Sequence, residues 1–218
     1  MLLVSKNGFC MILNKQELAV LNVFRKNLNK LMSIAEIQKI SKKASKAYVF
    51  NTLKKLESIG LIERKMVGTS SAFKAKSGSG TIKYFSLLDM EDFDKSNISG
   101  KTVQKLAAEF NPLKMPYCLM IFGSYAKGKA GEKSDIDIAI LVGGDKERKA
   151  FSASAESVAL REILPIHIEI ITTDEFFGML LAKEANLGKE IVYNHIIVSG
   201  NDIYYQLVDE AYKHGFSC

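Results

Sequence analysis

The sequence has few cysteines and no long apolar run, and both absences narrow the classes of protein to which it can belong. Its three cysteines, Cys10, Cys118 and Cys218, are odd in number and have no metal-ligand spacing, which fits a reducing cytoplasm. No uninterrupted apolar stretch approaches the ~20 residues of a membrane-spanning helix. The first residues lack a basic leader and a small-residue cleavage site, and Asn7-Gly8 instead suggests a hairpin. We therefore expect a cytoplasmic protein with no membrane partner.

A net positive charge is absent from the second half of the chain. Residues 1–88 hold 16 Lys and Arg against 4 Asp and Glu, a net charge of +12, whereas residues 101–218 hold 13 against 16, a net charge of −3. Residues 89–100 contribute a further −3. The overall charge of +6 therefore comes from the N-terminal part, which indicates a polyanionic partner there.

Helix signals fill the first sixty residues. Asn14 and Ser33 are typical helix N-caps, and apolar residues recur at helical spacing after each of them. A third helix is expected from about Ser45 to Ser58, ending at Gly60. The N-terminal part is thus predicted to begin as a small helical domain.

A basic hairpin is expected after the third helix. We place its strands at Leu61 to Val67 and Thr81 to Leu87, with residues 68–80 as a long tip that could include another short strand. Three helices followed by such a hairpin resemble a winged helix-turn-helix domain, which would cover residues 1–95. The acidic stretch from Asp89 to Asp94 marks the junction, and residues 96–116 form a linker with a helix over Lys101 to Phe110.

The resemblance implies that the third helix enters the major groove of double-stranded DNA and that the wing contacts the phosphate backbone. The alternative is a basic, solvated face on a domain that dimerises or docks a protein. The candidate DNA contacts are Lys42, Lys43, Lys46, Asn51 and Lys65, with Tyr48, Lys55, Lys74 and Lys76 beside them.

The run GSYAKGKAGEKSDIDIAIL, from Gly123 to Leu141, carries the chemistry of the second half. The apolar residues 117–122 before it predict a buried strand, and a helix is expected to begin after Gly123-Ser124. A turn between strand and helix offers free backbone N–H groups to a phosphate. Gly123 lets a phosphate approach the backbone, Ser124 adds a hydroxyl, and Lys127 adds a positive charge. We call residues 123–127 the phosphate turn.

Two carboxylates follow at strand spacing. Asp135 and Asp137 alternate with Ile136 and Ile138, so both acids lie on one face of a strand. Their Cα atoms are expected ~6.6 Å apart. Two carboxylates at that separation can share Mg²⁺ or Mn²⁺, which take oxygen ligands together with substrate phosphates.

A third carboxylate is offered by a second strand, residues 165–171, where His167 and Glu169 share the face opposite the isoleucines. If this strand lies beside the first, Glu169 faces the same side as Asp135 and Asp137. The alternative is that Glu169 and His167 are solvated residues on a half-buried strand.

The motif resembles that of the DNA polymerase β-like nucleotidyltransferase superfamily, in particular its minimal bacterial and archaeal members. The resemblance implies a mixed sheet, a nucleoside triphosphate substrate, and transfer of a nucleoside monophosphate with two metal ions. It assigns Asp135, Asp137 and Glu169 to metal binding and catalysis. Two departures are that the family often has Asp where Glu169 stands and Arg where Lys127 stands. The matching residues are Gly123, Ser124, Ala126, Gly128, Ser134, Asp135, Ile136 and Asp137.

We therefore expect an α/β protein of two domains, with a nucleotidyltransferase domain over residues 117–218 that uses ATP as its first choice of substrate. Helices are expected over residues 145–164, 173–185 and 203–214. The segment after the catalytic strands is short, which favours a hydroxyl group of a protein or small molecule as the acceptor. A second copy of the chain, forming a homodimer, is a further candidate partner. The resemblance suggests a toxin-like protein as one acceptor. The alternative is a DNA-binding, antitoxin-like regulator whose second domain binds nucleotide, through Gly123, Ser124, Lys127 and Ser134, without turnover.

Overall fold

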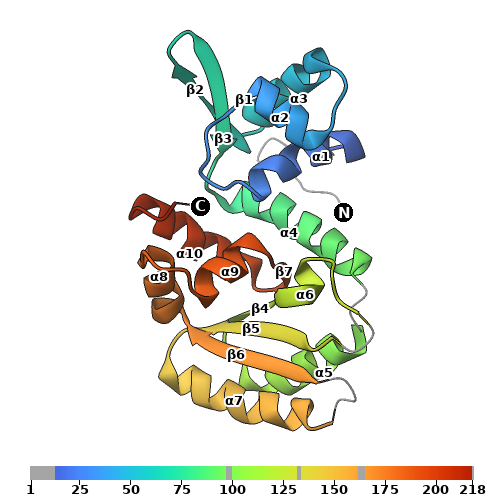
Figure 1. Ribbon diagram of the computed structural model, residues 1–218, viewed down its shortest axis with the longest axis vertical. Coiled ribbons are helices and arrows are strands. Elements are labelled where there is room, and N and C mark those ends of the chain that lie inside the picture. The colour runs from blue at the N-terminus through green and yellow to red at the C-terminus, as the bar shows by residue number, and fades with distance from the viewer. Residues whose placement is uncertain (1–12, 97–99, 132–133, 162–164, 218) are drawn as a thin grey trace. The chain divides into compact units, whose positions relative to one another are not determined.

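The structure is a computed structural model that describes residues 13–96, 100–131, 134–161 and 165–217 (Figure 1). The predicted hairpin at Asn7-Gly8 and two of the cysteines, Cys10 and Cys218, lie outside the described residues. Within them, no helix is both long enough and apolar enough to cross a membrane. Cys118 is buried and unpaired, and burial raises the pKa of its thiol, so it behaves as a core residue.

The chain divides into two compact units, residues 1–88 and 89–218, and each is described by itself. The division falls after Leu88, whereas the sequence had suggested that the first domain ends at residue 95. It lies inside a single helix, α4 (Ser79–Lys95). The acidic residues 89–94, predicted to be a junction, are therefore helical.

Unit 1 has helices followed by a hairpin. Its elements before α4 are α1 (Lys15–Arg25), β1 (Met32–Ser33), α2 (Ile34–Ser41), α3 (Lys46–Ser58), β2 (Ile62–Val67) and β3 (Ser70–Ala75). Asn14 and Ser33 cap α1 and α2, as the sequence predicted, and a glutamate three residues later closes a capping box at each. The strands pair antiparallel in the order β1-β3-β2.

The predicted hairpin is wrong in its second strand. β2 pairs with β3, and Val67 lies opposite Ser70, so the tip is the short turn at Gly68-Thr69. Gly68 has a φ of +59° there, as tight hairpin turns require. Residues 81–87 belong to α4 instead, because Thr81, Phe85 and Leu88 are buried at helical spacing. The predicted strand assumed that buried and exposed residues alternate here.

Unit 2 is built on a mixed sheet, which confirms the predicted fold class of this half. Within the sheet order β6-β5-β4-β7, β5 and β6 are parallel and the other pairs antiparallel. Its further elements are α5 (Gly100–Phe110), the 3₁₀ helix η1 (Asn111–Leu113), β4 (Tyr117–Ile121), α6 (Gly123–Ala126), β5 (Ile136–Val142), α7 (Asp145–Ala159), β6 (Ile166–Thr172), α8 (Thr173–Leu181), α9 (Leu187–Tyr193), β7 (Ile196–Ser199) and α10 (Asn201–Lys213).

Helices lie on both faces of this sheet (Figure 1). On one face α5 and α7 bury Phe110 and Phe151 against Ile136, Ile138 and Ile140 of β5. On the other face α8 and α10 pack together and contact the strands. The alternation along β5 therefore sends its isoleucines into one core and leaves the intervening positions, Asp137 among them, on the α8 face.

A buried carboxylate connects α4 to α10 inside unit 2. Asp89 is 2% exposed and accepts hydrogen bonds from Asn201 Nδ2 at 2.7 Å and from Tyr205 Oη at 2.9 Å. Tyr205 is itself buried, and this acceptor satisfies its hydroxyl. The C-terminal end of α4 is thus an integral part of the second unit.

Candidate active site

The phosphate turn lies directly against the carboxylate of Asp137. β4 ends at Ile121, and the Phe122 backbone N–H donates to the Asp137 carbonyl oxygen at 2.9 Å. Gly123 has a φ of +63°, and a Cβ added to it would lie 1.9 Å from Asp137 Oδ2. Only a glycine leaves room for this carboxylate, so the turn and the acid form one site.

Asp135 and Asp137 both lie away from the core formed by α5 and α7. Between them Ile136 is buried in that core, and its backbone N–H donates to the Pro165 carbonyl oxygen at 3.0 Å. Asp137 is half-buried, whereas Asp135 precedes β5 and is exposed. The two carboxylates are therefore placed by strand alternation at the start of β5.

Glu169 reaches the same face from β6, through His167. The parallel register pairs Asp137 with His167 and Ala139 with Glu169. His167 lies between the two acids, with Nδ1 3.6 Å from Asp137 Oδ1 and Nε2 3.1 Å from Glu169 Oε1. The sequence placed His167 on this face but gave it no part in the site. Its alternation with Glu169 was the signal available.

The residues present suit a divalent cation in part. In the portion of the chain that the structure describes, no three His, Cys, Asp or Glu side chains are grouped so as to hold a metal ion. Magnesium commonly takes only one or two carboxylates and completes its shell with phosphate oxygens and water. Asp135 and Asp137 fit that requirement as a pair of hard oxygen donors. The Glu169 carboxylate instead contacts His167, with Oε1 3.1 Å from Nε2.

The remaining predicted nucleotide contacts separate into two groups. Ser124 follows Gly123 in α6 and stays at the turn. Ser134 Oγ accepts from the Gly131 N–H at 2.9 Å and so shapes its own loop. Lys127 Nζ forms an ion pair with Glu190 Oε1 of α9 at 2.7 Å. Because this pair joins residues far apart in the chain, no local pattern could have revealed it.

Glu175, a nearby acid that could replace Glu169 as a proton acceptor, is committed to structure. Its carboxylate accepts from the Thr172 N–H at 3.0 Å and closes the capping box of α8. It also pairs with Arg148 of α7. The hydrogen bond from the Thr172 backbone, together with Arg148, lowers the pKa of Glu175. This carboxylate therefore serves as a helix cap.

The predicted basic face of unit 1 is largely open to solvent. Lys42, Lys46 and Asn51 are exposed, and Lys43 is half-exposed. Lys65 is exposed on β2, with Nζ 3.7 Å from Glu63 Oε1. Lys74 of β3 is instead half-buried, with Nζ 3.2 Å from Glu63 Oε1 and 3.1 Å from Asn29 Oδ1. The Tyr48 hydroxyl of α3 is buried. The exposed predicted contacts therefore lie just before α3, on α3 and on the wing.

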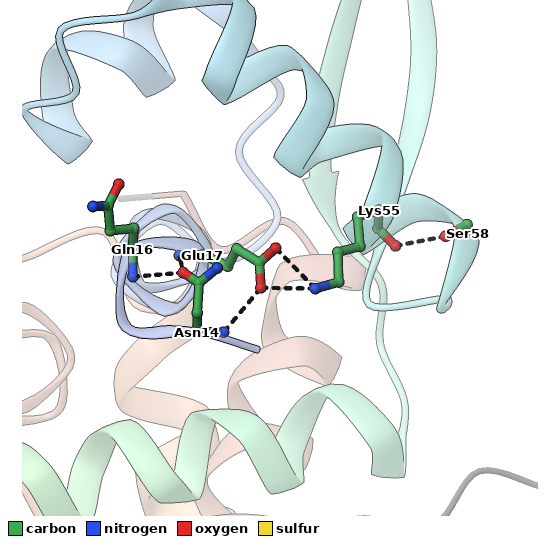
Figure 2. Close-up of polar contacts among 5 residues, drawn as sticks. All are labelled: Asn14, Gln16, Glu17, Lys55 and Ser58. Atoms are coloured by element: carbon green, nitrogen blue, oxygen red, sulfur yellow. Dashed lines mark hydrogen bonds and ion pairs between the residues drawn. The ribbon is translucent and has the colours of Figure 1, made fainter. Parts of the chain in front are cut away.

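Lys55 is the exception among the basic residues of α3. Figure 2 shows its ammonium between both oxygens of the Glu17 carboxylate, each at 2.8 Å. The same carboxylate accepts from the Asn14 N–H at 2.9 Å, so one acid caps α1 and ties it to α3. Lys55 is thereby engaged within unit 1.

Comparisons with known proteins bear on the second unit. Residues 103–194 match the model of the nucleotidyltransferase domain family. No match was found among curated proteins.

A chain from a crystal structure titled as a toxin-antitoxin with AMP-PNP is 20% identical, covering 54% of this chain and 89% of its own, with a TM-score of 0.37. TrmBL2, an archaeal chromatin protein with a novel mode of DNA binding, is 14% identical, covering 79% of this chain and 67% of its own, with a TM-score of 0.28. At these TM-scores neither likeness establishes a shared fold. The family match alone places a nucleotidyltransferase domain in the C-terminal half of the chain.

Proposed function

We propose that the protein is a Mg²⁺- or Mn²⁺-dependent nucleotidyltransferase that transfers a nucleoside monophosphate from a nucleoside triphosphate, ATP first, to a hydroxyl group of a protein or small molecule. The observation that carries this proposal is the contact of Gly123 with the Asp137 carboxylate. It puts a turn suited to phosphate beside an acid suited to a cation, on one face of the sheet. The match of residues 103–194 to the nucleotidyltransferase domain family supports the same reaction class.

Each residue has a role that follows from its position. The backbone at Gly123 and the Ser124 hydroxyl hold the phosphates, and Asp135 and Asp137 would hold the cation. Such a cation would neutralise charge on the phosphates. The acceptor oxygen forms a bond to the α-phosphorus, the bond from that phosphorus to the bridging oxygen breaks, and pyrophosphate leaves. Glu169 accepts the proton of the acceptor hydroxyl.

His167 is assigned a positioning role between the acids. Its ring lies 3.1 Å from Glu169 Oε1 and 3.6 Å from Asp137 Oδ1, so it fixes the separation of two carboxylates that would otherwise repel. It contacts no reacting atom in this assignment.

Binding without turnover is the second candidate function. It is favoured by the lack of a three-ligand group among the described side chains and by the attachment of Glu169 to His167. The protein would then be a regulator, antitoxin-like in its use of the nucleotide. Incubation with labelled ATP, Mg²⁺ or Mn²⁺ and cell lysate separates the two: a labelled protein or small molecule supports transfer, and nucleotide binding with no labelled product supports the regulator.

Replacing Glu169 by Gln is expected to lower turnover by roughly 10²- to 10⁴-fold, because the amide cannot accept the acceptor's proton. The pH dependence of turnover, measured on the labelled product, checks this. If the variant keeps wild-type turnover at every pH, another residue removes the proton. Asp174 is then the next to test, since Glu175 is occupied as a cap.

For unit 1 we propose a winged helix-turn-helix domain that binds double-stranded DNA. The supporting observations are the order α1-β1-α2-α3-β2-β3, the short wing, and the exposure of basic residues at the start of α3. The net charge of +12 over residues 1–88 suits a polyanion. Docking of a protein on the same basic face is the alternative.

Replacing Lys42, Lys43 and Lys46 together by Ala is expected to weaken binding to duplex DNA of any sequence. The slope of log K against log salt should become shallower by about 2 to 3, because each lost phosphate contact removes ~0.9. Fluorescence anisotropy of the full chain across a salt series measures the slope. Replacing Lys114, Lys146 and Lys149 of unit 2 by Ala gives the same change in charge and should leave the slope unaltered.

Asn51→Ala should instead reduce the preference between DNA sequences, if its amide reaches a base edge. No DNA binding at low salt, together with self-association or capture of a protein on this face, would replace the DNA proposal with the docking alternative.

A further inference from the structure

A cleft of about 980 Å³ lies in unit 2 beside the phosphate turn. It is lined by Lys127, the C-terminal end of α8, α9, and residues 215–217. The Lys127 backbone N–H donates to the Gly123 carbonyl oxygen at 3.2 Å, so the cleft begins at the turn. Its volume is in the range of clefts that hold small-molecule ligands.

An exposed aromatic ring lines this cleft. Tyr193 is the last residue of α9, and it is 59% exposed. Leu181, 39% exposed at the end of α8, is a second apolar side chain of the lining. Every nucleobase has a flat face that stacks on an exposed aromatic ring.

An uncommitted amide follows the ring. Asn194 is the C-cap of α9, and its side chain makes no hydrogen bond to any other residue in the described ranges. By contrast, the Asn186 amide donates to the Met179 carbonyl oxygen at 2.8 Å, and Lys189 Nζ donates to the Ala182 carbonyl oxygen. A free amide offers one acceptor and two donors, which complement the edge of a base.

The ion pair of Lys127 with Glu190 ties the phosphate turn to the helix that carries the ring. The pair closes at 2.7 Å, and Glu190 lies three residues before Tyr193 on α9. Phosphates at the turn and a base on α9 would therefore be held by parts of the molecule that are connected to each other. Neither the ring nor the amide takes part in the site formed by Gly123 and Asp137.

We propose that this cleft binds the nucleoside part of the nucleoside triphosphate, with the base stacked on the Tyr193 ring and its edge contacted by the Asn194 amide. The assignment rests on the proposed function, since it takes the triphosphate to occupy the phosphate turn. It adds that the base, and not only the phosphates, determines the affinity for substrate.

Calorimetric titration of the full chain with ATP and with inorganic tripolyphosphate, both with Mg²⁺, separates the two parts of the ligand. Tyr193→Ala should weaken ATP binding about tenfold or more, the loss expected for one stacked base. The same variant should leave the affinity for tripolyphosphate within about twofold. Tyr193→Phe keeps the ring and should bind ATP as the wild type does. Circular dichroism of each variant checks that the fold is retained.

Equal wild-type affinities for ATP and tripolyphosphate, both unchanged in Tyr193→Ala, would overturn the cleft assignment and leave the proposed function standing. A loss shared equally by both ligands would also overturn it, because the ring would then act on the fold. Absence of binding by either ligand would overturn the proposed function as well.

A photoreactive azido-ATP gives a second measurement that needs no variant. Cleavage after Lys189 and Lys213 releases residues 190–213, which include Tyr193 and Asn194. The label should lie in this peptide and be displaced by an excess of unlabelled ATP. Label confined to other peptides would contradict the assignment.

Discussion

Asp137→Asn should abolish nucleotidyl transfer while leaving unit 2 folded. The change removes a charge but little volume, and the Asp137 backbone contact with Phe122 is retained. A loss of about 10²- to 10⁴-fold in kcat/KM is expected, because a carboxylate that holds a cation contributes several kcal/mol to the stability of the transition state. Transfer of label from ATP, measured at saturating Mg²⁺, gives kcat/KM for the variant and for the wild type.

Asp145→Asn is the matched control, since Asp145 lies in the first turn of α7 and its side chain is 86% exposed. It should retain wild-type turnover. Asp137→Asn should also lose the dependence of ATP binding on Mg²⁺ in calorimetry. Activity within twofold of wild type in this variant would remove the two-carboxylate interpretation altogether.

Gly123→Ala should be nearly as damaging, although it removes no functional group. The new Cβ would lie 1.9 Å from Asp137 Oδ2, so the carboxylate has to move. A displacement of about 1 Å in a catalytic group costs on the order of 10² in rate. The positive φ at this position adds strain of about 1–3 kcal/mol to the folded state.

Gly128→Ala separates displacement from strain. Gly128 has a φ of +64°, almost the same as that of Gly123, but an added Cβ would meet no atom within 4 Å. Gly123→Ala should lose at least as much stability in urea unfolding as Gly128→Ala, whereas only Gly123→Ala should lose activity. Equal losses of activity would show that the backbone conformation, and not the contact with Asp137, governs the site.

The site was largely predictable where local pattern and close spacing determined it. Alternation along one strand is enough to place Asp135 and Asp137 on one face, and the glycine between strand and helix precedes them by a short loop. The parallel pairing that brings Glu169 to this face was conditional on strand order, which the structure supplies. The contact of His167 with both acids needed that register.

The parts that were not predicted depend on long-range pairing. The strand expected over residues 81–87 is helical because Phe85 and Leu88 bury a helical face, and tertiary packing of that kind overrides short alternation. α9 and β7 were not anticipated, since both are short. The ion pair of Lys127 with Glu190 forms between residues that are far apart in the sequence. The cleft beside Tyr193 was therefore not visible in the sequence.

The buried carboxylate of Asp89 limits where the protein can be cut into fragments for expression. A fragment beginning at residue 96 would leave Tyr205 and Asn201 without the acceptor that they share. A fragment ending at residue 95 would carry that carboxylate away from its two donors. Separate production of unit 2 should therefore begin before Asp89. A failure of either fragment divided at residue 95 would report on the missing hydrogen bonds, and not on the activity that it was made to test.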